Sequence, residues 1–193
     1  MTDRDFSPQD SLAVISNMIR EARQRYEENG AIFMVWGVSI ALVAAAQFYL
    51  MYLEMESASG IPYMALILTG IYTGYYYRKV PVRKGSNPIS RIMKLVWSAL
   101  GINLFILGFG FFFKLGYNLI PIIMIIQGFG LILSGAAIRS NIFLGAGILT
   151  QVVGYLGFFL APLYQPLLLV VMGIFALFIP GYTLYRNKQK QDV

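Results

Sequence analysis

Residues 115–138 read LGYNLIPIIMIIQGFGLILSGAAI, an apolar run without a charged side chain. A helix rises about 1.5 Å per residue and the hydrocarbon core of a bilayer is about 30 Å thick, so roughly 20 such residues can cross it. The run therefore predicts a transmembrane helix. The composition of the chain agrees, because 58% of its 193 residues are hydrophobic and 12% are charged, against about 25% charged in soluble domains.

Further apolar runs of similar length lie on both sides of this one. Together they predict an all-α, polytopic membrane protein with six transmembrane helices, in which residues 31–185 form the membrane domain. Residues 1–30 are expected to form a cytoplasmic amphipathic helix, and residues 186–193 a basic cytoplasmic tail. The other predicted spans are residues 31–53, 61–77, 95–113, 141–163 and 166–185.

Lysine and arginine predict the orientation, because they are retained on the cytoplasmic side of short loops. Six alternating spans place all but one of the 15 basic residues on one side. The exception is Lys114, on the side that also carries Glu54 and Glu56. Both termini are therefore expected in the cytoplasm. The basic residues on that side are Arg4, Arg20, Arg23, Arg25, Arg78, Lys79, Arg83, Lys84, Arg91, Lys94, Arg139, Arg186, Lys188 and Lys190.

The net charge of +6 is explained by these boundary positions, and no nucleic-acid partner is expected. The densest basic loop follows the second span. Its side chains are expected to contact anionic lipid headgroups, and they are Arg78, Lys79, Arg83 and Lys84.

An amphipathic helix is predicted before the first span, starting at Ser7-Pro8. Apolar residues follow at steps of three and four, which places them in one stripe. Two interpretations remain open: the helix lies in the headgroup region of the membrane, or the stripe docks a cytoplasmic protein or a second copy of the chain. The stripe consists of Leu12, Ile15, Ile19, Ala22 and Tyr26.

The chain contains neither cysteine nor histidine. This excludes thiol nucleophiles, zinc fingers, haem ligation by histidine and histidine general bases. No acidic or basic residue lies at the middle of a predicted span, which argues against a voltage sensor or a carboxylate proton relay. We therefore expect no enzymatic activity, no catalytic residue, no metal and no cofactor.

Polar side chains do occur near the middle of four predicted spans. They are Asn103, Gln127, Gln151 and Thr69. One hypothesis is that they form hydrogen bonds between helices. The other is that the amides converge on a site for a small neutral or zwitterionic ligand, because an amide both donates and accepts.

The spans also suggest three tandem hairpins arranged about a pseudo-threefold axis. Each second helix of a hairpin begins near Pro62, Pro121 or Pro166, and the segment around Trp36 resembles the segment around Trp97. Small residues at four-residue spacing predict close helix contacts. These are Gly37, Ala41 and Ala45, then Gly70 and Gly74, then Gly130 and Ser134.

The motifs MIREAR at 18–23, ENG at 28–30 and VWG at 35–37 resemble the opening of a group of uncharacterised small polytopic bacterial membrane proteins. The resemblance covers about the first 40 residues and implies a location in the bacterial inner membrane, with no activity to carry over. Two functions remain as hypotheses. The first is a non-enzymatic scaffold or regulatory protein that engages lipid or a cytoplasmic partner. The second is a small transporter or ligand-binding protein that uses the mid-span amides.

Overall fold

The computed structural model describes residues 12–20, 30–79 and 88–191, and within these ranges every regular element is a helix. This confirms the all-α prediction. Residues 12–20 are helical. The longer elements are α2 (Gly30–Tyr52), α3 (Ala65–Lys79), α4 (Pro88–Phe105), α5 (Phe112–Leu115), α6 (Leu119–Ile138), α7 (Asn141–Gly157), α8 (Gln165–Met172) and α9 (Ile179–Gln191). Short 3₁₀ turns are η1 (Glu56–Ala58), η2 (Ile61–Met64), η4 (Gly116–Asn118) and η5 (Pro162–Tyr164), and π-helical segments are η3 (Ile106–Gly110) and η6 (Gly173–Phe178).

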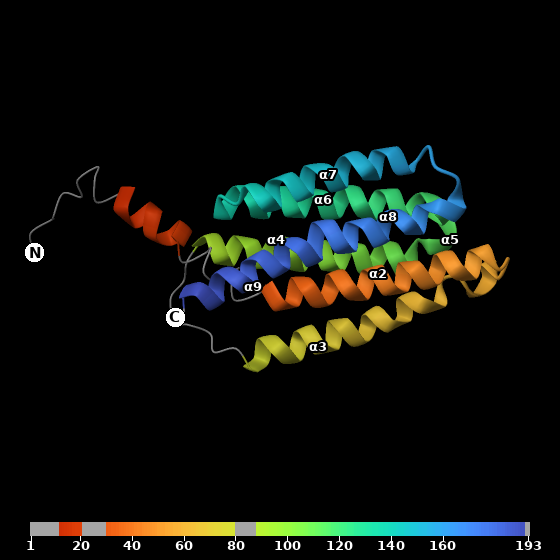
Figure 1. The fold of residues 1–193 in the computed structure, drawn as a ribbon, viewed down its shortest axis with the longest axis horizontal. Helices are drawn as coiled ribbons and strands as arrows, with labels where there is room; N and C mark the ends of the chain where they lie inside the picture. Colours follow the sequence, from red (N-terminus) through yellow and green to blue (C-terminus); the bar gives the residue numbers. More distant parts are fainter. Residues whose placement is uncertain (1–11, 21–29, 80–87, 192–193) are drawn as a thin grey trace, which may run out of the picture.

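The long helices run side by side along one axis (Figure 1), and α8, η6 and α9 continue one another as a single rod. Two helix pairs have the most extensive contacts: α6 with α7, and α2 with the α8–η6–α9 rod. Helix α3 packs mainly on α2 and on the η2 turn. The bundle is therefore built from two tight antiparallel pairs, with α3 at its margin.

Glycines allow α2 and the rod to meet backbone to backbone. A methyl group added to Gly37 would lie 2.5 Å from the carbonyl oxygen of Gly173, and one added to Gly173 would lie 2.5 Å from that of Gly37. The same reciprocal approach occurs between Gly30 and Gly181, at 2.6 and 2.8 Å. The close contact predicted at Gly37 is confirmed.

Helices α6 and α7 meet in the same way. Added methyl groups on Gly128 and Gly147 would each lie 2.8 Å from the carbonyl oxygen of the other residue. By contrast, nothing lies within 4 Å of a methyl group added to Gly70 or Gly74 in α3. The close contact predicted for that pair is wrong. Their spacing places them on one face of α3, but none of the described helices covers that face.

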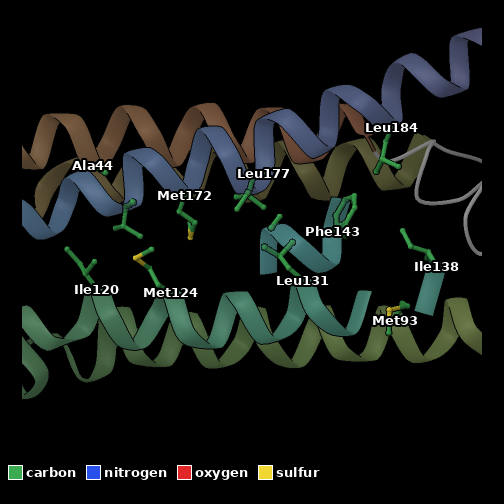
Figure 2. Packing of buried hydrophobic residues seen from close by; sticks show 13 residues of the cluster. Ala44, Met93, Ile120, Met124, Leu131, Ile138, Phe143, Met172, Leu177 and Leu184 are labelled. Atoms are coloured by element: carbon green, nitrogen blue, oxygen red, sulfur yellow. The ribbon is translucent and has the colours of Figure 1, made fainter. Parts of the chain in front are cut away.

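The hydrophobic core lies between these two helix pairs. Figure 2 shows side chains from α6, including Met124 and Leu131, pointing toward Met172 and Leu177 of the rod. Phe143 of α7 has no solvent exposure, and its ring lies 5.2 Å from the ring of Phe33 in an edge-to-face arrangement. This interior is typical of a packed helical bundle.

The predicted number of six spans is not borne out. In the described part of the chain, four helical stretches are long and apolar enough to cross a membrane: Gly30–Tyr52, Arg91–Gly110, Phe112–Ile138 and Pro162–Asn187. The predicted spans 141–163 and 61–77 do not meet both requirements, for two different reasons.

Helix α7 is apolar but only 17 residues long. It ends at Gly157 because Ala161 has extended backbone angles (φ −58°, ψ 141°), the conformation favoured immediately before a proline, here Pro162. Helix α3 begins only at Ala65, after a 3₁₀ turn that contains Pro62, and has 15 residues. Its last turns hold Tyr75, Tyr76 and Tyr77, which favour the interface over the hydrocarbon core.

The basic residues gather at one end of the bundle, which we call the cationic end. The ends of α3, α6 and α9 and the starts of α2, α4 and α7 all lie there (Figure 1). Lys114 lies in α5, Glu54 follows α2 and Glu56 begins η1, all at the opposite end. The described cations at the cationic end are Arg78, Lys79, Arg91, Lys94, Arg139 and Arg186.

Two hairpins share a hydrogen-bond motif. The Trp36 indole Nε1 donates to the Thr73 hydroxyl at 3.0 Å, and the Trp97 indole Nε1 donates to the Ser134 hydroxyl at 3.0 Å. Both pairs are separated by 37 residues. Each hydroxyl in turn donates to a backbone carbonyl four residues earlier. The first two hairpins therefore match in detail, while the pseudo-threefold arrangement stays a prediction.

Candidate functional site

Asn103 lies on α4 and is exposed. Its side-chain nitrogen Nδ2 donates to the backbone carbonyl of Ala99 at 2.9 Å, one turn earlier on the same helix. The side chain therefore makes no hydrogen bond to another helix within the described part of the chain.

Gln151 of α7 turns toward α6. Its Nε2 donates to the carbonyl of Ile125 at 3.5 Å, and its Cγ would lie 2.6 Å from a methyl group added to Gly128. This contact joins the two helices of the tightest pair, so Gln151 serves helix packing.

Thr69 and Gln127 are both buried, with 8% of each side chain exposed. The Thr69 hydroxyl donates to the Ser39 hydroxyl at 3.0 Å and so joins α3 to α2. Gln127 lies on the buried face of α6 between Met124 and Leu131. It forms no hydrogen bond with any of the described residues.

The four predicted residues thus lie at different places in the bundle, and only some of them face another helix. Asn103 is exposed on α4, Gln151 packs against α6, and Thr69 bonds α2. No hydrogen bond among the described residues joins one amide to another. An apolar groove with a volume of about 330 Å³ lies between α2 and η6 beside Gly37, Ala41 and Phe178, and none of the four predicted residues lines it.

Replacing Gln127 by methionine is expected to stabilise the bundle. A fully buried amide without a hydrogen-bond partner costs about 1 to 3 kcal/mol. The amide atoms of Gln127 are not completely enclosed, so we expect part of this cost. Methionine has a similar length and no polar group. We expect Gln127→Met to raise the free energy of unfolding by about 1 kcal/mol in SDS titrations of the detergent-solubilised protein. A lower stability would mean that Gln127 has a polar partner, such as water or a solute.

The cationic end carries exposed side chains on several helices. Arg78 and Lys79 close α3, Arg91 and Lys94 lie in the first two turns of α4, and Arg186 lies on α9. All five are exposed. Their charges are therefore available to headgroups or to a soluble partner.

Arg139 ends α6 in a left-handed backbone conformation (φ 51°, ψ 47°). The backbone N–H of Ser140 donates to the carbonyl of Gly135 at 2.8 Å, as in a Schellman cap. Glycine is the usual residue at such a position, because a side chain there adds strain. The turn into α7 thus carries a cation where the backbone favours glycine.

The helix of residues 12–20 extends outward at the cationic end of the bundle (Figure 1). Leu12 and Ile15 are 66% and 51% exposed, and Ile19 is half-buried. Arg20 on its polar side donates to Asn17 at 2.8 Å. The remaining predicted residues Ala22, Tyr26, Arg83 and Lys84 lie outside the described residues.

Sequence reasoning missed a polar contact at the opposite end. Gln165 is 3% exposed, and its Nε2 donates to the carbonyls of Gly157 and Leu160, which joins α7 to α8. Its Oε1 is buried without a partner. A second such contact joins η2 to α2, where the Tyr63 hydroxyl donates to Gln47 Oε1 at 2.7 Å. In the sequence, a glutamine directly before Pro166 predicts such a contact only weakly, because the carbonyl groups that it can reach depend on where the preceding helix ends.

Comparison with protein-family models, with curated proteins and with solved structures finds no match. The class of protein therefore rests on the chain itself. Its long helices pack as one bundle, and four helical stretches among the residues that the structure describes are long and apolar enough to cross a bilayer. Many large apolar side chains face outward. The chain is a multi-pass helical membrane protein.

Proposed function

We propose that this protein is a non-enzymatic membrane scaffold or regulatory protein of a bacterial inner membrane. Its cationic end faces the cytoplasm and binds anionic lipid headgroups. The helix of residues 12–20 lies beside that end and engages the same headgroup layer or a cytoplasmic protein. The absence of cysteine and histidine from the sequence supports a role without catalysis.

One observation carries the proposal: exposed cations from α3, α4, α6 and α9 meet at one end, and the described acidic residues lie at the other. Cations near a membrane surface each contribute about 1 kcal/mol of attraction to anionic lipid. Arg139 strengthens the case, because a charged side chain stands at a turn where glycine would fit the backbone better.

We propose further that α3 and α7 lie within the membrane beside the four longer helices. They run along the same bundle axis (Figure 1), and α7 is the main partner of α6. Seventeen helical residues span about 25 Å, and a bilayer thins locally to fit a shorter helix at modest cost. With these two helices the chain crosses the membrane six times, which returns it to the side where it began. The start of α2 at Gly30 and the end of α9 then both face the cytoplasm.

Headgroup binding is tested by thermal unfolding in detergent with added lipid. Phosphatidylglycerol is expected to raise the Tm more than phosphatidylcholine does, because anionic headgroups bind the folded cationic end. Replacing Arg78, Lys79, Arg91 and Lys94 by glutamine should remove this difference. Lys114→Gln, at the opposite end, is the matched control and should keep it. Equal Tm increases for both lipids in the unmodified protein would contradict the proposal.

Arg139→Gly removes both the charge and the backbone strain of this residue, and two different measurements report on the two effects. Glycine adopts the left-handed conformation without penalty, so we expect the free energy of unfolding to rise by about 1 kcal/mol in a neutral detergent. The phosphatidylglycerol-dependent part of the Tm increase should become smaller. A variant that is less stable and still responds fully to the anionic lipid would show that Arg139 acts through local contacts.

A ligand-binding or transport function remains a second candidate because of one residue, Gln127, which is buried on α6 without a hydrogen bond among the described residues. The dispersed positions of Asn103 and Gln151 weigh against it. Uptake of neutral and zwitterionic solutes into proteoliposomes tests it. Flux that depends on the protein and is lost in Gln127→Leu would favour transport.

A further inference from the structure

Asn103 lies near the middle of the bilayer on an exposed helix. It follows Lys94 by nine residues and precedes Lys114 by eleven. Lysine side chains reach the headgroup region or water at the ends of a transmembrane stretch. The amide between them is therefore close to the centre of the hydrocarbon.

The amide of Asn103 has unused hydrogen-bonding capacity. One N–H donates to the carbonyl of Ala99, while the second N–H and Oδ1 have no partner in the described part of the chain. Other mid-span polar groups face a neighbouring helix, as Thr69 and Ser134 do. Lipid tails offer no hydrogen bonds, so an exposed amide at this depth is unfavourable unless another protein surface meets it.

The surface around Asn103 is suited to a close helix contact. Ala99 and Ile106 lie four residues before it and three after it, so they share its side of the helix. Both are exposed. Lys94 lies nine residues away, which at about 100° per residue places it on the opposite side. A small residue beside the amide allows a second backbone to approach, and no charge obstructs it.

Helix α4 is also the least covered of the long helices. In its most apolar stretch 6% of the residues are buried, against 56% for the span Phe112–Ile138. On the Asn103 side of the helix, Ala99, Asn103 and Ile106 are all exposed. The chain itself therefore leaves this face of α4 open.

We propose that a second copy of the chain covers this face and that the two Asn103 side chains hydrogen-bond to each other. An amide is self-complementary, because it donates and accepts. Two copies inserted with the same orientation are related by an axis along the membrane normal, and that symmetry brings identical residues together at identical depth. A different partner would need its own polar group at this depth.

Disulfide crosslinking tests the contact in native membranes, since the chain has no cysteine. Ala99→Cys and Ile106→Cys should each give a covalent dimer on mild oxidation. Leu68→Cys, on α3 and 69% exposed, is the control and should remain monomeric. Crosslinking that is absent at both α4 positions, or equally strong at Leu68→Cys, would overturn the proposal.

The contribution of the amide to dimer formation is measured by Förster energy transfer between donor-labelled and acceptor-labelled copies of the full chain in liposomes. Lowering the ratio of protein to lipid gives the dissociation constant of the dimer. Asn103→Leu should weaken association about tenfold, and Asn103→Gln should retain most of it. Unfolding of Asn103→Leu in SDS should be unchanged, because its one hydrogen bond lies within its own helix. A monomeric unmodified protein would refute the idea. So would a dimer that Gly74→Ile disrupts and Asn103→Leu does not, because the interface would then lie on α3.

Discussion

Gly147→Leu is expected to disrupt the α6–α7 pair. The first added carbon would lie 2.6 Å from the backbone nitrogen of Ile132 and 2.8 Å from the carbonyl oxygen of Gly128. Both are backbone atoms, so the helices must separate to make room. We expect a loss of about 3 kcal/mol or more in the free energy of unfolding, and a large fraction of aggregated protein after detergent extraction. Size-exclusion chromatography and SDS titration measure both.

Gly145→Leu provides a matched control on the same helix, two residues away. Nothing lies within 4 Å of a methyl group added there, and the new side chain would face lipid. Its stability should stay within about 0.5 kcal/mol of the original protein. Equal damage from both substitutions would indicate a general effect of bulk in α7 and would contradict the packing of Gly147 against Gly128.

Phe143→Ala is expected to have the second largest effect. The ring is fully buried and packs edge-to-face with the ring of Phe33, so its removal leaves a cavity between α7 and α2. In a membrane the transfer of apolar surface contributes little, since lipid also solvates the unfolded helices. The lost dispersion contacts remain, and we expect a destabilisation of about 3 kcal/mol.

Phe159→Ala controls for the loss of an aromatic ring as such. Phe159 is 89% exposed, so truncation should leave the SDS unfolding midpoint unchanged. A midpoint for Phe143→Ala close to that of Phe159→Ala would contradict the core shown in Figure 2.

The sequence is a good guide to the apolar helices because the requirement is local: each must present enough apolar length to the hydrocarbon. It is a poorer guide to where α3 and α7 end. The signals were present at Pro62 and Pro162, since proline and the residue before it resist a continuous helix. Hydropathy alone does not register these prolines and therefore predicts six full-length spans.

Packing partners depend on information that a single helix lacks. Gly37 and Gly70 both belong to small-residue patterns, yet Gly37 meets Gly173 and Gly70 meets nothing within 4 Å. The spacing gives the face of the helix, and only the other helices decide whether that face is covered. The same holds for the amides: the sequence indicates the depth of Asn103 and Gln127, but not that the first is exposed and the second buried.

The sidedness of the bundle is tested most directly with single cysteines and a membrane-impermeant thiol reagent. Ser57 lies in η1 at the opposite end, and Ser140 lies in the turn between α6 and α7 at the cationic end. Both substitutions, Ser57→Cys and Ser140→Cys, change only one atom. In intact bacterial cells Ser57→Cys should be labelled, and Ser140→Cys only after the inner membrane is permeabilised. Labelling of Ser140→Cys in intact cells would contradict a cytoplasmic cationic end and the headgroup binding proposed for it.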